Sequence, residues 1–125
     1  MATKQQKLKK KLQVVFNSYI RKRDEGKPCI SCGIKKNPLD AGHFFAVKGY
    51  DGLRYDEDNV HGECPGCNRF DESHLIMYQK NLQKRIGKSG FDKLMKRSQD
   101  YKRNGYKFSV PELEELIDYY KNKLK

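Results

Sequence analysis

The four cysteines of the chain occur as two Cys-x-x-Cys pairs, Cys29 with Cys32 and Cys64 with Cys67. Two such pairs can present four thiolates to one Zn²⁺ in a closed tetrahedron. Because a closed site has no open coordination position, we predict a structural zinc ion that joins two distant segments and takes no part in catalysis. Two disulfides are the alternative, but pairs of this spacing in a lysine-rich chain favour metal ligation in a reducing compartment.

Polar side chains of a second kind lie between the two pairs. Asp40, His43 and Asn59 stand between them, and Asn68 directly follows the last cysteine. Hydrolysis of a phosphodiester needs a base, a metal ion that neutralises the leaving oxygen and a group that orients the base. Neutral imidazole has a suitable basicity near pH 7. These residue types can supply all three functions, although His43, at the start of an apolar run, could also be a core histidine.

The formal charge of +11 is unevenly distributed along the chain. Residues 1–27 carry nine Lys or Arg against two acids, residues 28–74 carry five against eight, and residues 75–125 carry thirteen against six. Basic flanks suit a polyanion such as a nucleic-acid backbone, and we expect Lys7, Lys10 and Lys11 among the DNA contacts. The acidic centre suits a hard divalent cation. The alternative is that the lysines only keep a small protein in solution.

With 125 residues, the chain favours one domain with extensions, and its 36% hydrophobic content allows only a small core that zinc would reinforce. No run of 18 apolar residues is present, so we expect no transmembrane helix and no membrane partner. The charged N-terminal stretch does not resemble a secretory signal.

The apolar pattern predicts helices at both ends of the chain. A first helix is expected over residues 4–24, where six apolar residues form one stripe: Leu8, Leu12, Val15, Phe16, Tyr19 and Ile20. Further helices are expected over residues 68–86, from residue 90 or 91 to about 103, and after the N-cap Ser109 with its capping-box Glu112. Gly87 should stop the second helix.

Between the cysteine pairs the sequence predicts two strands. Residues 39–47 have strand character, residues 48–52 are rich in turn formers, and residues 53–55 are expected to form the returning strand before an acidic connection over 56–59. We therefore predict an α+β protein in three segments: a basic helix over 1–27, a zinc-stapled core over 28–87 and a helical extension over 88–125.

The segments KPCISCG, DAGHF, LRYDEDNVHGECPGCN and RIG occur in an order that resembles the lambdoid-phage NinG family of recombination endonucleases, also called Rap. The spacing of His43, Asn59 and Asn68 resembles the HNH motif of ββα-metal nucleases. The likeness runs from about Leu12 to Gly87. Longer members of the family carry further sequence ahead of the first helix, with additional cysteines, whereas this chain starts almost at that helix.

The resemblance implies a role for each motif residue. His43 would be the general base, Asn59 would help to hold it in position, and Asn68 would bind a catalytic Mg²⁺ or Mn²⁺, while the four cysteines hold the structural zinc. Many HNH enzymes place an Asp or His ligand immediately before the base, but Gly42 stands there in this chain.

The departure at residue 42 calls for another metal ligand. Asp40 would share the strand face of residue 42, so we expect it to bind the ion, with Asp71 and Glu72 as the alternatives. Arg54 and Arg69 could clamp phosphate or form structural salt bridges.

The resemblance further implies a ββα-metal core flanked by basic helices, and an endonuclease that cuts branched recombination intermediates such as Holliday junctions and D-loops. It would be phage-encoded and act in the cytoplasm of a bacterial host. A homodimer would suit paired incisions, and the apolar stripes of the terminal helices permit one. The alternatives are a non-catalytic zinc module that binds nucleic acid and a zinc-stapled adaptor that binds protein.

Overall fold

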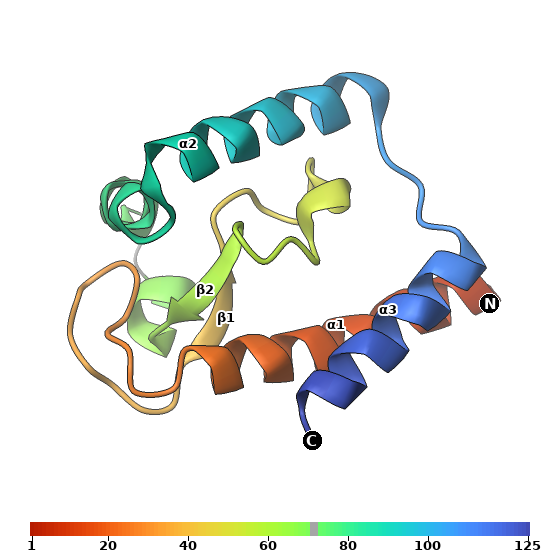
Figure 1. The fold of residues 1–125 in the computed structure, drawn as a ribbon, viewed down its shortest axis with the longest axis horizontal. Coiled ribbons are helices and arrows are strands. Elements are labelled where there is room, and N and C mark those ends of the chain that lie inside the picture. Colours follow the sequence, from red (N-terminus) through yellow and green to blue (C-terminus); the bar gives the residue numbers. More distant parts are fainter. Residues whose placement is uncertain (71–72) are drawn as a thin grey trace.

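In a computed structural model of the protein, residues 1–70 and 73–125 are described. The elements follow the order α1 (Lys4–Arg23), β1 (Asp40–His43), the 3₁₀ turn η1 (Asp51–Leu53), β2 (Val60–Glu63), the π-helical turn η2 (Gly66–Phe70), α2 (His74–Asn104) and α3 (Val110–Lys123). The predicted α+β class is confirmed. In Figure 1, the small sheet lies between α2 and the side-by-side pair of α1 and α3. Among the described residues, no helix has an apolar stretch long enough to cross a bilayer.

The terminal helices begin at hydroxyl N-caps, of which the sequence predicts Ser109, and they pack against each other. The Thr3 hydroxyl accepts a hydrogen bond from the Gln6 amide at 3.1 Å in a full capping box at α1, whereas the Ser109 hydroxyl caps α3 by accepting from the Glu112 amide at 3.2 Å and the Glu112 side chain accepts from the Tyr106 hydroxyl instead. Their apolar stripes meet in one buried cluster, which includes Phe16 of α1 and Tyr120 of α3 with ring centroids 4.9 Å apart. The apolar stripes that would permit a homodimer therefore pack against each other within one chain. The division into three segments stays a prediction.

The sheet has two antiparallel strands, with Asp40 opposite Glu63 and His43 opposite Val60. Because opposed side chains share a face, Asp40 and Glu63 lie on one face with residues 42 and 61, whereas His43 and Val60 lie on the other. The first face packs against α2, whose Tyr78 hydroxyl donates to the Gly42 carbonyl at 2.7 Å. The second face packs against α1, where Val60 joins the cluster around Phe16.

The predicted returning strand over residues 53–55 is wrong, and the second strand is instead β2. Residues 44–59 form a loop, in which Leu53 ends the 3₁₀ turn η1 and is fully buried. The buried Asn59 side chain pins this loop, because its amide donates to the carbonyls of Phe45 and Leu53, both at 3.1 Å. Burying Leu53 and satisfying these carbonyls outweighs the weak strand propensity of the segment.

The helix predicted from residue 68 starts later, since residues 66–70 form η2 and α2 begins at His74. The predicted stop at Gly87 is found as a break within α2, where Gly87 has φ 78° and ψ 166°. A positive φ suits glycine, and the helix axis turns at this position before continuing to Asn104 (Figure 1).

A buried charge network joins the end of α1 to β2 and α2. The Asp24 side chain is fully buried and accepts hydrogen bonds from the Arg23 guanidinium at 2.9 and 3.0 Å and from the Gly62 amide at 2.7 Å. Arg85 of α2 lies 3.7 Å and His61 lies 3.9 Å from the same carboxylate. Burial alone would raise the pKa of Asp24, but the hydrogen bonds and nearby cations outweigh it and lower the pKa to about 2.

Candidate metal centres and catalytic residues

The four cysteines form one compact cluster whose ligand atoms all lie within 4.8 Å of one another. A tetrahedral zinc site with Zn–S bonds of about 2.3 Å separates its sulfurs by about 3.8 Å, and the Cys32 and Cys64 sulfurs lie 4.0 Å apart. The Cys29 sulfur also accepts the amides of Cys32 at 3.4 Å and Cys64 at 3.3 Å. None of the cysteines forms a disulfide. The cluster can therefore hold a metal ion such as zinc, and among the described residues no other group of His, Cys, Asp and Glu ligands comes as close together.

His43 is the last residue of β1, and its ring is held by the loop that follows. Its Nε2 lies 3.0 Å from the Arg54 carbonyl oxygen. Since a carbonyl can only accept, Nε2 carries the proton and Nδ1 carries the lone pair. Burial lowers the pKa of His43, and it outweighs the hydrogen bond to the Arg54 carbonyl, which raises the pKa, while the Arg54 charge acts in the same direction as burial. The imidazole is therefore neutral near pH 7 and able to accept a proton at Nδ1.

Asn59 lies in the core directly before β2 and fastens the loop over 44–59 from within. Its Oδ1 accepts from the Phe45 amide at 2.8 Å, and its backbone carbonyl accepts from the Phe44 amide at 2.9 Å. The same side chain holds the Leu53 carbonyl, one residue before the carbonyl that binds His43. Asn59 and His43 are thus linked through the loop, and among the described residues no hydrogen bond joins their side chains.

Asp40, Asn68 and Arg69 come together where β1 starts. The Asn68 side-chain amide donates to the Asp40 carboxylate at 3.1 Å, and the Arg69 guanidinium binds both Asp40 oxygens at 2.9 Å. The Arg69 side chain is 59% exposed, so this pair can open to solvent at little cost. The structure therefore brings together the two residues that the sequence offers for a divalent ion, with a guanidinium on their carboxylate.

The carboxylate of Glu63 lies on the same sheet face, and the sequence pattern did not indicate it as a site residue. Glu63 is fully buried, and its Oε2 accepts from the Ser31 hydroxyl and from His74 Nδ1, the latter at 2.6 Å. Its Oε1 is buried and has no hydrogen-bond partner among the described residues. A Cβ added to Gly42 would lie 2.3 Å from this oxygen. The Glu63 side chain thus occupies the space beside residue 42, where the sequence lacks a ligand.

The remaining predicted residues lie in different places. The Arg54 side chain is bound by Asp51 and Gln13, both at 2.9 Å, which is the structural salt bridge considered as its alternative. Exposed positions on α1 hold Lys7, Lys10 and Lys11. The two alternative metal ligands, Asp71 and Glu72, lie outside the described residues.

The candidate base and the candidate metal ligands lie on opposite faces of β1. His43 and Asp40 are three residues apart, which at about 3.3 Å per residue is about 10 Å along the strand. The structure therefore places the candidate base at one end of β1 and the candidate metal ligands at the other.

Residues 1–125 match the sequence profile of a family described as Bacteriophage Lambda NinG protein. The chain is 34% identical to Protein ninG of Escherichia phage 933W over 93% of this chain and 56% of that protein. It is 35% identical to Protein ninG of Salmonella phage P22 and 32% identical to Protein ninG of Escherichia phage lambda, in both cases over 93% of this chain and 55% of the relative. The chain thus spans about half the length of the curated relatives that it matches. No solved structure matches the chain at a significant level.

Proposed function

Because the chain belongs to the family of the bacteriophage lambda NinG protein, we propose that it is an HNH-type, metal-dependent DNA endonuclease that cuts branched recombination intermediates such as Holliday junctions and D-loops. It would act in phage recombination inside the bacterial host. The observation that carries the proposal is the His43 ring, which burial keeps neutral and the Arg54 carbonyl fixes as one tautomer, at the opposite end of β1 from the Asp40 carboxylate and its Asn68 partner.

The role of His43 follows from its hydrogen bond. Nε2–H stays bound to the Arg54 carbonyl, so Nδ1 accepts the proton of the water that attacks phosphorus, and the ring becomes imidazolium. The Arg54 carbonyl then stabilises that charge. Asn59 keeps the loop, and with it this carbonyl, in place.

The residues around Asp40 fit a hard divalent cation. A carboxylate from Asp40 and an amide oxygen from Asn68 are ligands that Mg²⁺ and Mn²⁺ accept, and Asn68 would turn its Oδ1 toward the ion. Among the described residues, Glu63 Oε1 is buried and has no hydrogen-bond partner, and a cation nearby would offset the cost of burying that oxygen. When bound, the ion would neutralise the scissile phosphate and the departing 3′ oxygen. Arg69 would leave Asp40 and be available to a phosphate.

The test uses a labelled four-way junction and a linear duplex of matching sequence, with Mg²⁺ or Mn²⁺ present. Wild type should cut the junction, whereas His43→Gln should bind it with equal affinity and lose about 10²–10⁴-fold in rate, as is usual for a general base. The glutamine amide can still donate to the Arg54 carbonyl, so a loss of fold is not expected. Added imidazole should restore part of the activity of His43→Gly.

The outcomes separate the proposal from its rivals. If wild type binds the junction but does not cut it with any divalent ion, the enzyme proposal fails and the non-catalytic zinc module takes its place. Cleavage that survives His43→Gln would remove His43 as the base. Equal cleavage of junction and duplex would remove the preference for branched substrates.

A further inference from the structure

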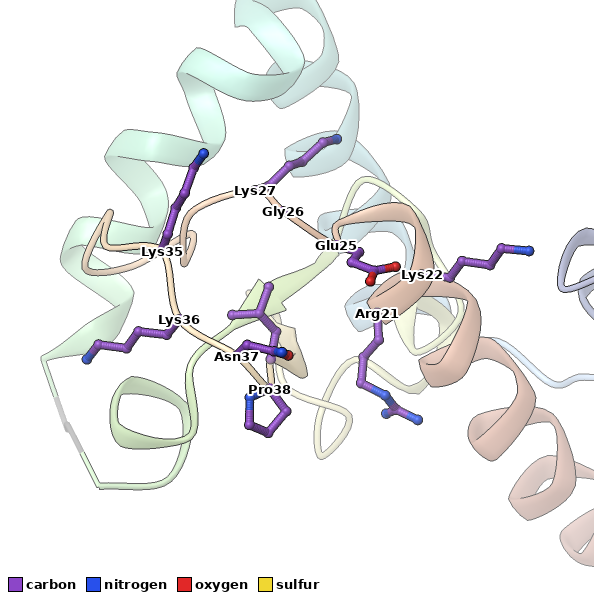
Figure 2. A pocket seen from close by; sticks show the side chains of 10 residues that line it. Arg21, Lys22, Glu25, Gly26, Lys27, Lys35, Lys36, Asn37 and Pro38 are labelled. Carbon is purple, nitrogen blue, oxygen red and sulfur yellow. The ribbon is translucent and has the colours of Figure 1, made fainter.

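A basic hollow of ≈ 650 Å³ lies between the C-terminal end of α1 and the segment that leads into β1 (Figure 2). Cationic residues dominate its lining, with Arg21, Lys22, Lys27, Lys35 and Lys36 against the single acid Glu25. The DNA contacts expected from the sequence lie elsewhere, at the start of α1 and at two arginines of the core. The hollow therefore adds a second basic region next to the zinc cluster.

The cationic groups surround the hollow instead of meeting at one point. Figure 2 shows their charged ends directed outward from its rim, with Lys27 and Lys35 pointing to one side and Lys36, Arg21 and Lys22 pointing to three others. A small anion is best held by donors that converge on it. Charges spread around a hollow suit a ligand that carries several anionic groups in a row, as a phosphodiester backbone does.

These cations are largely unpaired inside the protein. Only Lys27 has a carboxylate within salt-bridge distance among the described residues, and that carboxylate, Asp24 at 3.6 Å, already binds Arg23. Lys22 donates to the backbone carbonyl of Leu124, directly after α3, at 3.0 Å. Their charge is therefore available to an external anion.

Local roles account for part of this arrangement. Basic residues in the last turn of α1 favourably oppose the helix dipole, which covers Arg21 and Lys22. Lys36 lies 3.8 Å from the Cys64 sulfur and would help to neutralise the charge of a thiolate-bound zinc. Neither role applies to Lys35, and neither explains why a helix end and a separate loop bring their charges to one hollow.

We propose that this hollow binds the phosphate backbone of the DNA arm that adjoins the cut. Leu39 lines the hollow and is followed directly by Asp40, so a backbone held there continues toward the candidate metal ligands. The inference rests on the DNA cleavage proposed above and adds the surface that holds the uncut part of the substrate.

The test compares two triple variants with the same change of charge. Arg21→Gln, Lys22→Gln and Lys35→Gln together remove three exposed charges from the hollow and leave Lys36 beside the zinc cluster. Lys88→Gln, Lys93→Gln and Lys96→Gln remove three exposed charges from α2 and serve as the control. Binding of a labelled four-way junction is measured from low to high NaCl in buffer without added divalent ions, and the zinc content of each protein is checked.

The hollow variant should bind the junction about ten-fold or more weakly at low salt, and its plot of log K against log [NaCl] should be shallower by about 1 for each lost phosphate contact. The control should stay within about two-fold of wild type. Equal losses in both variants would mean that only total charge matters and would overturn the inference. Unchanged junction binding by the hollow variant, with a wild type that binds and cuts, would also overturn the inference. That result would leave the proposed function standing. Wild type that neither binds nor cuts the junction would refute both.

Discussion

The close approach of Gly42 and Glu63 across the sheet gives a sharp test of the site geometry. In Gly42→Ala, the new methyl would lie 2.3 Å from Glu63 Oε1 and 2.8 Å from Glu63 Cβ. Rotation of the carboxylate can relieve the first overlap but not the second, because Cβ is fixed to the backbone. We expect the substitution to lower the free energy of unfolding by about 1–3 kcal/mol, the usual cost of overpacking.

A double-mutant cycle isolates the part of this cost that comes from the carboxylate. Glu63→Ala removes the overlap with Oε1 but leaves the Cβ in place, so the double variant should be more stable than the sum of the two single effects predicts, by about 1 kcal/mol. Gly66→Ala is the matched control, since a Cβ there meets nothing within 4 Å and should change stability by less than about 0.5 kcal/mol.

The assay is denaturant unfolding of the zinc-loaded proteins, with stability compared at equal m-values. Gly42→Ala that unfolds at the wild-type denaturant midpoint would refute the close packing of Glu63 against β1. An additive cycle would show that the Glu63 carboxylate does not occupy the space beside residue 42.

Three further results are expected. Because burial lowers the pKa of His43, the acid limb of the pH profile of kcat/KM should have its midpoint below the ordinary histidine pKa of about 6.5. A midpoint above that value in a pH–rate series would contradict His43 as the base. Asp24→Asn should lower the free energy of unfolding by about 2 kcal/mol at pH 7, since a carboxyl pKa lowered from 3.8 to about 2 stabilises the fold above pH 4. In thermal unfolding, the advantage of wild type over this variant should vanish as the pH falls toward 2. The exposed control Asp92→Asn should match wild type at every pH. Cys67→Ser should lower both zinc content and melting temperature, and an unchanged temperature after zinc loss would refute a structural zinc.

Local signals in the sequence were sufficient for the two terminal helices and the cysteine cluster. The N-caps Thr3 and Ser109 precede clear apolar periodicity, and the break at Gly87 follows from its tolerance of positive φ. The cysteine side chains already define the ligand type, and the fold needs only to bring the two Cys-x-x-Cys pairs together. These features depend on residues close together in the chain.

The second strand and the Glu63 site depend on contacts that no local pattern encodes. Residues 53–55 have the composition of a strand, yet Leu53 is buried under α2 and the buried Asn59 side chain holds the loop. Once β2 is placed at Val60–Glu63, its register puts Glu63 on the same sheet face as Gly42. The Glu63 side chain then fills the space beside residue 42, where the sequence lacks a metal ligand. Alternation in Val-His-Gly-Glu was the one signal for this strand, and it was too short to decide.

The pairing of α1 with α3 also fixes the order in which parts of the protein can assemble during synthesis. Phe16 of α1 is covered by α3 residues that are made roughly 100 positions later, which at about 5–20 residues per second means a delay of about 5–20 s. The cysteine cluster is complete at Cys67, so zinc can close the centre of the nascent chain while the apolar side of α1 is still open. If the cluster holds zinc, a nascent chain without the ion would therefore expose both the cysteine centre and the apolar side of α1, which favours aggregation over folding.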